Sequence, residues 1–302
     1  MHGNERVSEQ CLFKYHFADA HCSETSIDHL CRLLEISRSG YYAWKNRGVS
    51  LRKQKEQRLL RLLVSYHAMY PAAGLDVLYH MIQKECPCSR NTIHRLMKLY
   101  NIHSLRKKAY KVTTHSKHHD EVSPNLLQRD FSANKPNQKW VGDITYIPTD
   151  EGRLYAAIVK DLCLKKIVGY AFSSCIDTNL TVSALEMAVR RQKPQSELIF
   201  HSDRGVQYAS AQYREILAKY NITQSMSKKG DPYDNAVAEN FFSCLKCELV
   251  HLKHYHTRAE AQADVFAYIE AYYNTVRPRS ALNWLSPAAY ERLLSVYAAK
   301  VA

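Results

Sequence analysis

No stretch of the 302-residue sequence is apolar over the ~20 residues that a helix needs to cross a bilayer. The first ten residues, MHGNERVSEQ, are polar and lack the hydrophobic region of a signal peptide. From these two absences we expect a cytoplasmic protein that does not contact membranes.

Metal-binding cysteine patterns are also missing, although the chain has nine cysteines. Cys244 and Cys247 form a C-x-x-C, and Cys86 and Cys88 flank a proline, but neither pair has a second pair at zinc-finger spacing. We interpret the cysteines as reduced thiols, as is usual in a chain that is not exported.

Acidic residues are too few to balance the basic ones, 29 against 42. Between Lys45 and Arg129 the sequence has 17 basic and 5 acidic residues, a local net charge of +12, and the remainder is nearly balanced. A basic segment beside a neutral one is typical of a nucleic-acid binder with an attached core domain. The alternative is a solvated basic surface with no such partner.

The N-terminal third is predicted to be helical, in two segments over residues 1–50 and 51–102. In the first, Ile27, Leu30, Cys31 and Leu34 recur at helical spacing, and Ser37 can cap a second helix. In the second, helices are expected over 54–68, over 75–84 and after Ser89. Short helices joined by tight turns favour helix-turn-helix DNA-binding modules, with a partnerless helical bundle as the alternative. The expected DNA contacts are Arg38, Arg90, Arg95 and Lys98.

Residues 103–135 are predicted to be a basic linker with little periodicity. Its run Arg106-Lys107-Lys108 is a further candidate DNA contact. His115, His118 and His119 lack a cysteine or acidic ligand frame, so we interpret them as solvated linker residues.

Residues 136–295 are predicted to form an α/β core. KWVGDITYI, RLYAAIVKDL and KIVGYAFSS are rich in β-forming residues, and a hairpin turn over 149–152 separates the first two. A helix (178–191), a buried strand (ELIFHSD), a helix (210–220), a strand (222–226) and a helix from about Asp234 to Val250 follow. This order predicts a ribonuclease-H-like fold with a mixed five-stranded sheet and helices.

Three carboxylates in this core occupy informative positions. Asp143 lies inside a strand, where an ionised side chain is costly to bury unless it is paired or metal-bound. Asp203 follows the end of a buried strand, where α/β folds collect their active sites. Glu239 lies beside the apolar stripe of its helix. Three convergent carboxylates suit hard divalent cations, and two such ions can activate the attacking oxygen and stabilise the leaving oxygen of a phosphodiester.

The motifs that carry these carboxylates resemble those of a known family. They are Trp140-x-x-Asp143-Ile144-Thr145-Tyr146, His201-Ser202-Asp203-Arg204-Gly205-x-Gln207-Tyr208 and Asp234-Asn235-Ala236-x-x-Glu239-x-Phe241-Phe242. Thirty-five residues separate Asp203 from Glu239. Together with Ile36 to Tyr42 and Tyr273-Asn274-x-x-Arg277-Pro278, they resemble insertion-sequence transposases of the IS-three type (OrfB), which have a retroviral-integrase-like core.

The resemblance implies a DDE transposase that cleaves DNA and joins a transposon 3′-hydroxyl end to target DNA. It implies that Asp143, Asp203 and Glu239 bind the catalytic metal, Mg²⁺ or Mn²⁺, with two ions expected. It also implies a homo-oligomer on DNA, which would be associated with the nucleoid if the source is bacterial. Heptad repeats are absent from the N-terminal segment, which leaves open whether the chain acts alone or with an upstream-frame partner or fusion segment.

Other residues receive roles from the same resemblance. Lys246 matches a basic residue of the family, and its spacing of seven from Glu239 places both on one helical face, where it could hold a DNA phosphate. The alternative is a surface lysine. His201 and Asn235 are expected at the rim of the active site or, alternatively, in structural roles at a strand end and a helix cap. Arg277 is expected either to contact phosphate or to lock the C-terminal helix.

Two segments depart from the family pattern. Arg279 stands where the family often has histidine, and residues 70–77 replace a segment that usually carries tyrosine and arginine. The second departure leaves open whether the second helical module still contacts DNA. Two rival functions remain: an RNA-directed nuclease on the same fold, and a DNA-binding regulator whose core is inactive.

Overall fold

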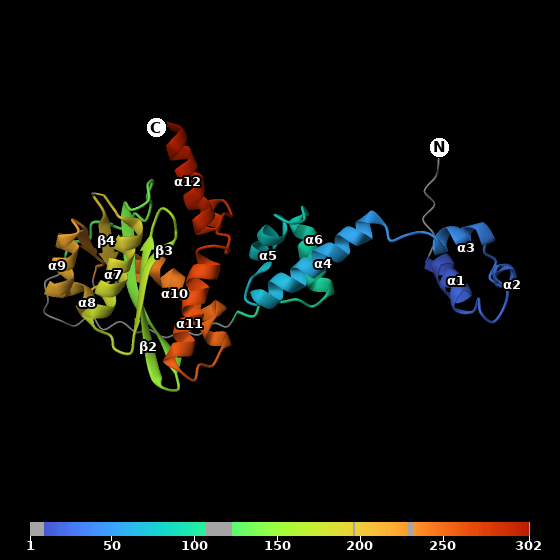
Figure 1. The fold of residues 1–302 in the computed structure, drawn as a ribbon, viewed down its shortest axis with the longest axis horizontal. Helices are drawn as coiled ribbons and strands as arrows, with labels where there is room; N and C mark the ends of the chain where they lie inside the picture. The colour runs from blue at the N-terminus through green and yellow to red at the C-terminus, as the bar shows by residue number, and fades with distance from the viewer. Residues whose placement is uncertain (1–8, 107–122, 196, 229–231, 302) are drawn as a thin grey trace. The chain divides into compact units, whose positions relative to one another are not determined.

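The computed structural model describes residues 9–106, 123–195, 197–228 and 232–301. The chain divides into two compact units, one up to Arg61 and one from Leu62 onward. The boundary falls inside helix α4 (Leu51–Met69), which is continuous in Figure 1. No helix in the described ranges combines the length and the apolarity needed to cross a membrane.

The first unit contains helices α1 (Glu9–Ala20), α2 (Ile27–Leu33) and α3 (Arg38–Lys45). The helices α2 and α3 confirm the prediction for residues 27–46, and the Ser37 hydroxyl accepts the predicted cap hydrogen bond from Gly40 N at 2.9 Å. The sequence did not predict α1. Its apolar side chains do not share one face, since Leu12, Phe13 and Phe17 are exposed while Tyr15 and Ala18 are buried.

The second unit begins with the end of α4, followed by α5 (Leu75–Ile82) and α6 (Arg90–Leu99). The break at Gly74 and the cap at Ser89 are both as predicted, because Gly74 is the N-cap of α5 and Ser89 Oγ accepts from Thr92 N at 3.2 Å. The ring of Tyr70 stacks on that of Tyr272 with 4.3 Å between the ring centroids. These helices therefore pack within the same unit as the sheet.

The sheet of the second unit has five strands in the order β3-β2-β1-β4-β5. The strands are β1 (Lys139–Thr149), β2 (Gly152–Asp161), β3 (Ile167–Ser173), β4 (Ile199–Ser202) and β5 (Thr223–Met226). The strands β1, β2 and β3 are antiparallel, whereas β4 pairs in parallel with both β1 and β5. The predicted hairpin turn is present, since Thr149 pairs with Gly152. The mixed five-stranded sheet is thus confirmed.

Helices cover both faces of this sheet, and Figure 1 shows the layers. On one face α7 (Thr178–Gln192), α8 (Val206–Ala209) and α9 (Ala211–Lys219) enclose a core around Trp140, Phe200 and Tyr213. On the other face α10 (Ala236–Glu248) and α11 (Arg258–Ala267) pack around Phe241 and Ile269. Short 3-10 helices at Pro232–Asn235 and Val250–Leu252 flank α10. This arrangement is the predicted ribonuclease-H-like fold.

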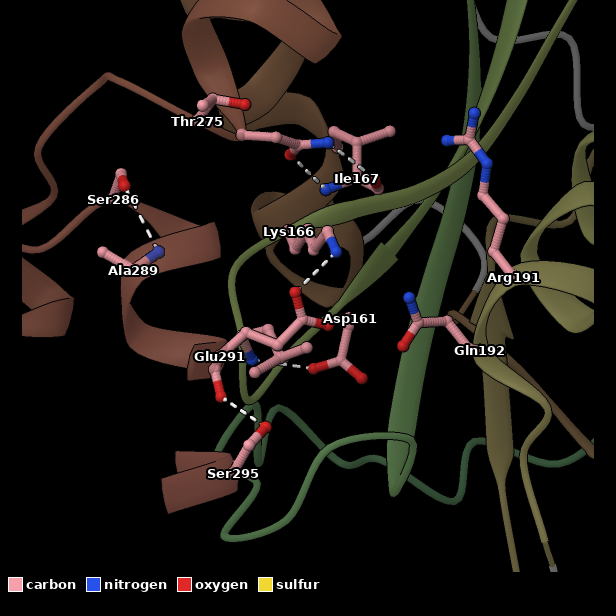
Figure 2. A network of polar contacts seen from close by, with 12 residues as sticks. Asp161, Lys166, Ile167, Arg191, Gln192, Thr275, Ser286, Ala289, Glu291 and Ser295 are labelled. Atoms are coloured by element: carbon pink, nitrogen blue, oxygen red, sulfur yellow. Dashed lines mark hydrogen bonds and ion pairs between the residues drawn. The ribbon is translucent and has the colours of Figure 1, made fainter. Parts of the chain in front are cut away.

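The C-terminal segment is tied to the start of β3. A π-helix (Tyr268–Tyr273) follows α11, and after a 3-10 turn (Ser280–Leu282) the last helix is α12 (Pro287–Val301). The side-chain amide of Asn274 accepts from Ile167 N at 3.0 Å and donates to Ile167 O at 2.9 Å, as a neighbouring strand would. Figure 2 shows the adjacent ion pair, in which Lys166 Nζ lies 2.7 Å from Glu291 Oε2 on α12.

Candidate active site

Strand register brings Asp143 and Asp203 to the same place. In the parallel pair β1/β4, Val141 lies opposite His201. Asp143 follows Val141 by two residues, and Asp203 follows His201 by two residues. Both carboxylates therefore lie at the carboxyl end of β4. Each has one oxygen fixed by a backbone amide: Asp143 Oδ1 accepts from Ile144 N at 2.8 Å, and Asp203 Oδ1 accepts from Gly205 N at 3.0 Å.

Glu239 lies in the first turn of α10, and a buried network holds the segment that precedes this helix. The Asp234 carboxylate accepts from Lys228 N and from Asn125 Nδ2, both at 2.8 Å, and from Arg129 Nε at 3.2 Å. The Asp234 carbonyl oxygen lies 2.9 Å from His201 Nε2. Because His201 belongs to β4, these contacts fix the start of α10 beside the strand that ends at Asp203.

The charges of the three carboxylates act on one another. Burial and then the negative charge of Asp203 raise the pKa of Asp143 well above its ordinary value, with a further increase from Glu239. Burial and the charge of Asp203 also raise the pKa of Glu239. The hydrogen bond from Ile144 N and the charge of Lys246 oppose the shift at Asp143. The structure therefore brings the three residues into one negatively charged region.

This donor set fits a divalent cation. All three side chains offer oxygen ligands, which Mg²⁺ prefers, and their mutual repulsion is what a bound cation would relieve. Residues from β1, the end of β4 and α10 could therefore hold a metal at this edge of the sheet.

Lys246, on α10, lies close to residues of β1. Its positive charge acts on Asp143, and its Nζ lies 5.1 Å from the ring centroid of Tyr146 on β1. Burial lowers the pKa of Lys246, and the charge of Asp143 partly offsets this change. The half-buried lysine thus lies close enough to Asp143 for its charge to act on that carboxylate.

His201 and Asn235 are both buried, at 0% and 5% exposure. The Nδ1 atom of His201 lies 2.8 Å from Ser225 Oγ on β5, and Nε2 contacts the Asp234 carbonyl, so its ring links three elements of the core. Asn235 is the N-cap residue of α10 by position, yet its side chain makes no cap hydrogen bond and its Oδ1 has no hydrogen-bond partner. The contacts of His201 favour the structural alternative.

Arg277 is buried as well, and the structure favours the second of its two expected roles. Its Nε and Nη2 atoms donate to Glu248 Oε2 and Oε1 at 3.0 and 2.7 Å, and Tyr268 Oη donates to Oε2 at 2.9 Å. Glu248 is the last residue of α10. Arg277 therefore locks the C-terminal segment onto the helix that carries Glu239 and Lys246. Arg279 lies over the Tyr273 ring, 4.8 Å from its centroid.

Three of the expected DNA contacts form ion pairs within the chain. Arg38 Nε lies 3.0 Å from Asp28 Oδ1, Arg90 Nε lies 2.6 Å from Asp76 Oδ1, and Arg106 pairs with Glu248. Asp76 belongs to the segment that departs from the family pattern. Arg95 and Lys98 are exposed on α6, whereas Lys107 and Lys108 lie outside the described residues.

A buried lysine and the cations around the motif residue Tyr146 were not predicted from the sequence. Lys160 on β2 is buried, its Nζ donates to the Val237 carbonyl in α10 at 3.1 Å, and burial lowers its pKa well below the ordinary value. The Arg153 guanidinium lies over the ring of Tyr146, 4.8 Å from the ring centroid. No local pattern could reveal the contact of Lys160 with Val237 or that of Tyr146 with Lys246, because the partners are distant in sequence.

The sheet order and its acidic edge define an integrase core of the ribonuclease-H-like class, and two family models described as "Integrase core domain" match residues 133–232 and 201–287. The chain is 38% identical over 282 residues to the transposase InsF for insertion sequence IS3A of Escherichia coli (strain K12), covering 92% of this chain and 98% of that protein. The chain belongs to the IS3-type family of insertion-sequence transposases.

Two further similarities accompany this match. An uncharacterized 31 kDa protein of insertion element IS600 from Shigella sonnei is 39% identical over 263 residues, which are 86% of this chain and 97% of that protein. The catalytic core domain of HTLV-2 integrase, solved in complex with magnesium, is 15% identical with a TM-score of 0.37, over 51% of this chain and 96% of that chain.

Proposed function

We propose that this chain is a DDE transposase that cleaves DNA and joins a transposon 3′-hydroxyl end to target DNA, with Asp143, Asp203 and Glu239 as its catalytic residues. The observation that carries the proposal is the meeting of three carboxylates from β1, the end of β4 and α10, where burial and then the charge of Asp203 raise the pKa values of Asp143 and Glu239. The transposases named among its relatives support the same reaction.

The three carboxylates would hold the divalent cation, Mg²⁺ or Mn²⁺, and two ions are expected. Two such ions would polarise the scissile phosphate and stabilise both the attacking and the leaving oxygen. The backbone amide of Ile144 fixes one carboxylate oxygen of Asp143, and the backbone amide of Gly205 fixes one carboxylate oxygen of Asp203. Each contact also sets the direction of the second oxygen of the same carboxylate. The ligands are thus oriented before the ion arrives.

Lys246 would bind a phosphate of the strand end. Its ammonium is a flexible point charge that can follow a phosphate as it moves, and its position near Asp143 places that phosphate at the carboxylates. The 3′-hydroxyl oxygen would attack the phosphorus of the target strand in line and lose its proton to water. The bond from phosphorus to the departing 3′-oxygen would break, and that oxygen would take up a proton from water. Because it lies near Asp143, the Lys246 charge would also offset part of the negative charge that develops on the attacked target phosphate.

The DNA partners would be the transposon ends and the target. Basic residues before the core supply the charge for this binding, with α4 and α6 as the exposed part. We also propose that the protein acts as a homo-oligomer on DNA, since two transposon ends must meet one target site.

The test is a strand-transfer assay on labelled transposon-end DNA with Mg²⁺ or Mn²⁺. Asp143→Asn, Asp203→Asn and Glu239→Gln should each abolish both cleavage and joining, because each removes a charged ligand, while the unfolding midpoint and duplex binding stay close to wild type. A regulator would bind DNA without cutting it, and a nuclease would cut without joining. Normal strand transfer by Glu239→Gln would contradict the assignment.

A further inference from the structure

A second group of metal-ligand side chains lies at the opposite end of the β1–β2 hairpin. His254, Tyr255 and His256 form the connection between the 3-10 helix after α10 and the start of α11. Tyr255 is buried at 4% exposure, whereas both histidines are exposed. The alternation of a buried residue between two exposed ones places both imidazoles on the outer side of this segment.

The hairpin turn supplies a carboxylate to the same place. Asp150 donates its backbone N–H to the Tyr255 carbonyl at 3.1 Å. Its side chain lies between the two rings, with Oδ1 3.0 Å from His254 Nε2 and Oδ2 2.8 Å from His256 Nδ1. Among the residues that the structure describes, Asp150, His254 and His256 are the group whose ligand atoms all lie within 4.8 Å of one another.

We propose that Asp150, His254 and His256 form a binding site for a divalent transition-metal ion of the Zn²⁺, Co²⁺ or Ni²⁺ type. Two imidazoles and one carboxylate suit these ions, whereas Mg²⁺ takes oxygen ligands. Bonds of about 2.0–2.1 Å to one ion hold neighbouring ligand atoms roughly 3 Å apart, and the observed nitrogen–oxygen separations have this size. Solvent fills the remaining coordination positions, because all three side chains are exposed.

The protein backbone already holds the ligands in place. Thr257 and Glu260 form a capping box at the start of α11, and Glu260 Oε2 also accepts from His256 N at 2.9 Å. From the hairpin turn, Glu151 Oε2 accepts a hydrogen bond from Arg258 N at the start of α11, at 2.8 Å. Because these bonds join the hairpin turn to the α11 entry without any ion, little conformational entropy is lost when the metal binds.

The site is separate from the catalytic carboxylates. Asp143 lies six residues before Thr149, the last residue of β1, and at about 3.3 Å per residue this is roughly 20 Å of strand before the turn that carries Asp150. The proposal therefore does not depend on the catalytic assignment. A metal here would join the β1–β2 turn to α11 and stabilise the folded state.

The experiment titrates the full-length protein with Co²⁺ in buffer containing excess Mg²⁺, which occupies oxygen-only sites, and follows the visible absorption of bound Co²⁺. Zn²⁺ then displaces Co²⁺, and its effect on the melting temperature is measured separately. The variants are His254→Gln and His256→Gln, with His94→Gln on α6 as the matched control, since His94 is also exposed.

We expect one equivalent of Co²⁺ to bind the wild type and His94→Gln, and each site variant to bind at least ~10-fold more weakly, the least effect that losing even a supporting partner has at metal sites. Zn²⁺ should raise the melting temperature of the wild type but not that of either site variant. Equal binding by all proteins would place the ion elsewhere, for example at cysteines, and overturn the proposal. Absence of binding to the wild type would overturn it equally.

Discussion

Gly142 precedes Asp143 on β1, and a Cβ atom built on it would lie 2.4 Å from Phe200 Cζ on β4. The ring of Phe200 fills the space that any side chain at this position would need. Because Phe200 is fully buried against Tyr208 and Tyr213, it has little room to move. The position of the catalytic strand next to β4 thus depends on a residue without a side chain.

We therefore expect Gly142→Ala to force β1 and β4 apart. The free energy of unfolding should fall by about 1–3 kcal/mol, the usual cost of overpacking a core, and strand transfer should fall further because Asp143 moves away from Asp203. Urea denaturation and the joining assay measure the two effects. Gly48→Ala is the control, since no atom lies within 4 Å of a Cβ built there. Equal stability of the two variants would contradict the steric argument.

Lys246 offers a second test at this scale. Lys246→Ala should lower strand transfer by about 10- to 100-fold, equivalent to ~1.4–2.7 kcal/mol, while non-specific duplex binding changes little. Lys246→Arg should retain part of the activity.

The matched control is Lys219→Ala. Lys219 also lies over a tyrosine ring, 5.3 Å from the Tyr220 centroid, but it is exposed on α9. If the Lys246 and Lys219 variants join DNA equally well, Lys246 is only a helix surface residue.

At the scale of elements, the C-terminal end of α10 is held by the pair Arg277–Glu248. Burial raises the pKa of Glu248, but the hydrogen bond and charge of Arg277 outweigh burial, and the net pKa is lowered. A lowered pKa means that the folded state favours the ionised carboxylate. The stabilisation is complete above the unfolded pKa of about 4.3 and is lost as the pH falls through the lower folded value.

Arg277→Ala should therefore lower the free energy of unfolding at neutral pH, by up to about 3–5 kcal/mol, because a buried carboxylate loses its bidentate partner and keeps only Arg106 and Tyr268. The stability difference between the wild type and Glu248→Gln should narrow as the pH falls below about 4.3. Urea titrations at several pH values measure both. If Arg277 instead contacts DNA, Arg277→Ala will fold normally and bind DNA with a weaker salt dependence.

The elements themselves were largely predictable. Ser37 and Ser89 carry local cap signals, and the turn over 149–152 separates two strands whose apolar pattern is strong. The same local chemistry could not reveal the π-helix Tyr268–Tyr273 or the burial of Arg277, because both depend on how distant segments pack. The three carboxylates were identified from motif context, whereas their mutual electrostatic effect required the strand register.

At the scale of the whole molecule, part of the basic segment between Lys45 and Arg129 belongs to the same compact unit as the sheet. The residues from Leu62 to Arg106 pack in the same compact unit as the core. A truncation after the linker would therefore remove contacts such as the stacking of Tyr70 on Tyr272. Substitutions in the full-length chain test the DNA-binding role of the basic segment more cleanly.

We expect the triple substitution of Arg52, Lys53 and Lys55 by Gln to weaken duplex binding. All three are exposed on α4. If each neutralises one phosphate, the slope of log K against log salt should become shallower by about 2–3, since each contact contributes ~0.9. Fluorescence anisotropy at several salt concentrations measures the slope.

The control replaces three exposed cations that follow the basic segment, Lys135, Arg190 and Lys219, by Gln. The two triple variants lose equal charge, so a general field effect would change both slopes alike. Equal slopes would mean that DNA is not bound mainly through the segment before the core.

The parallel pairing of β1 with β4 also governs when the protein becomes active after synthesis. The hairpins β1–β2 and β2–β3 join neighbouring segments, whereas Val141 and His201 meet across about 60 residues of chain. Contacts between distant segments form slowly, because the intervening loop must be closed first. A nascent chain can thus fold its hairpins early. If Asp143, Asp203 and Glu239 are the catalytic residues that we propose, it lacks a complete set of them until α10 has left the ribosome and docked, and it should not cut the DNA beside it before then.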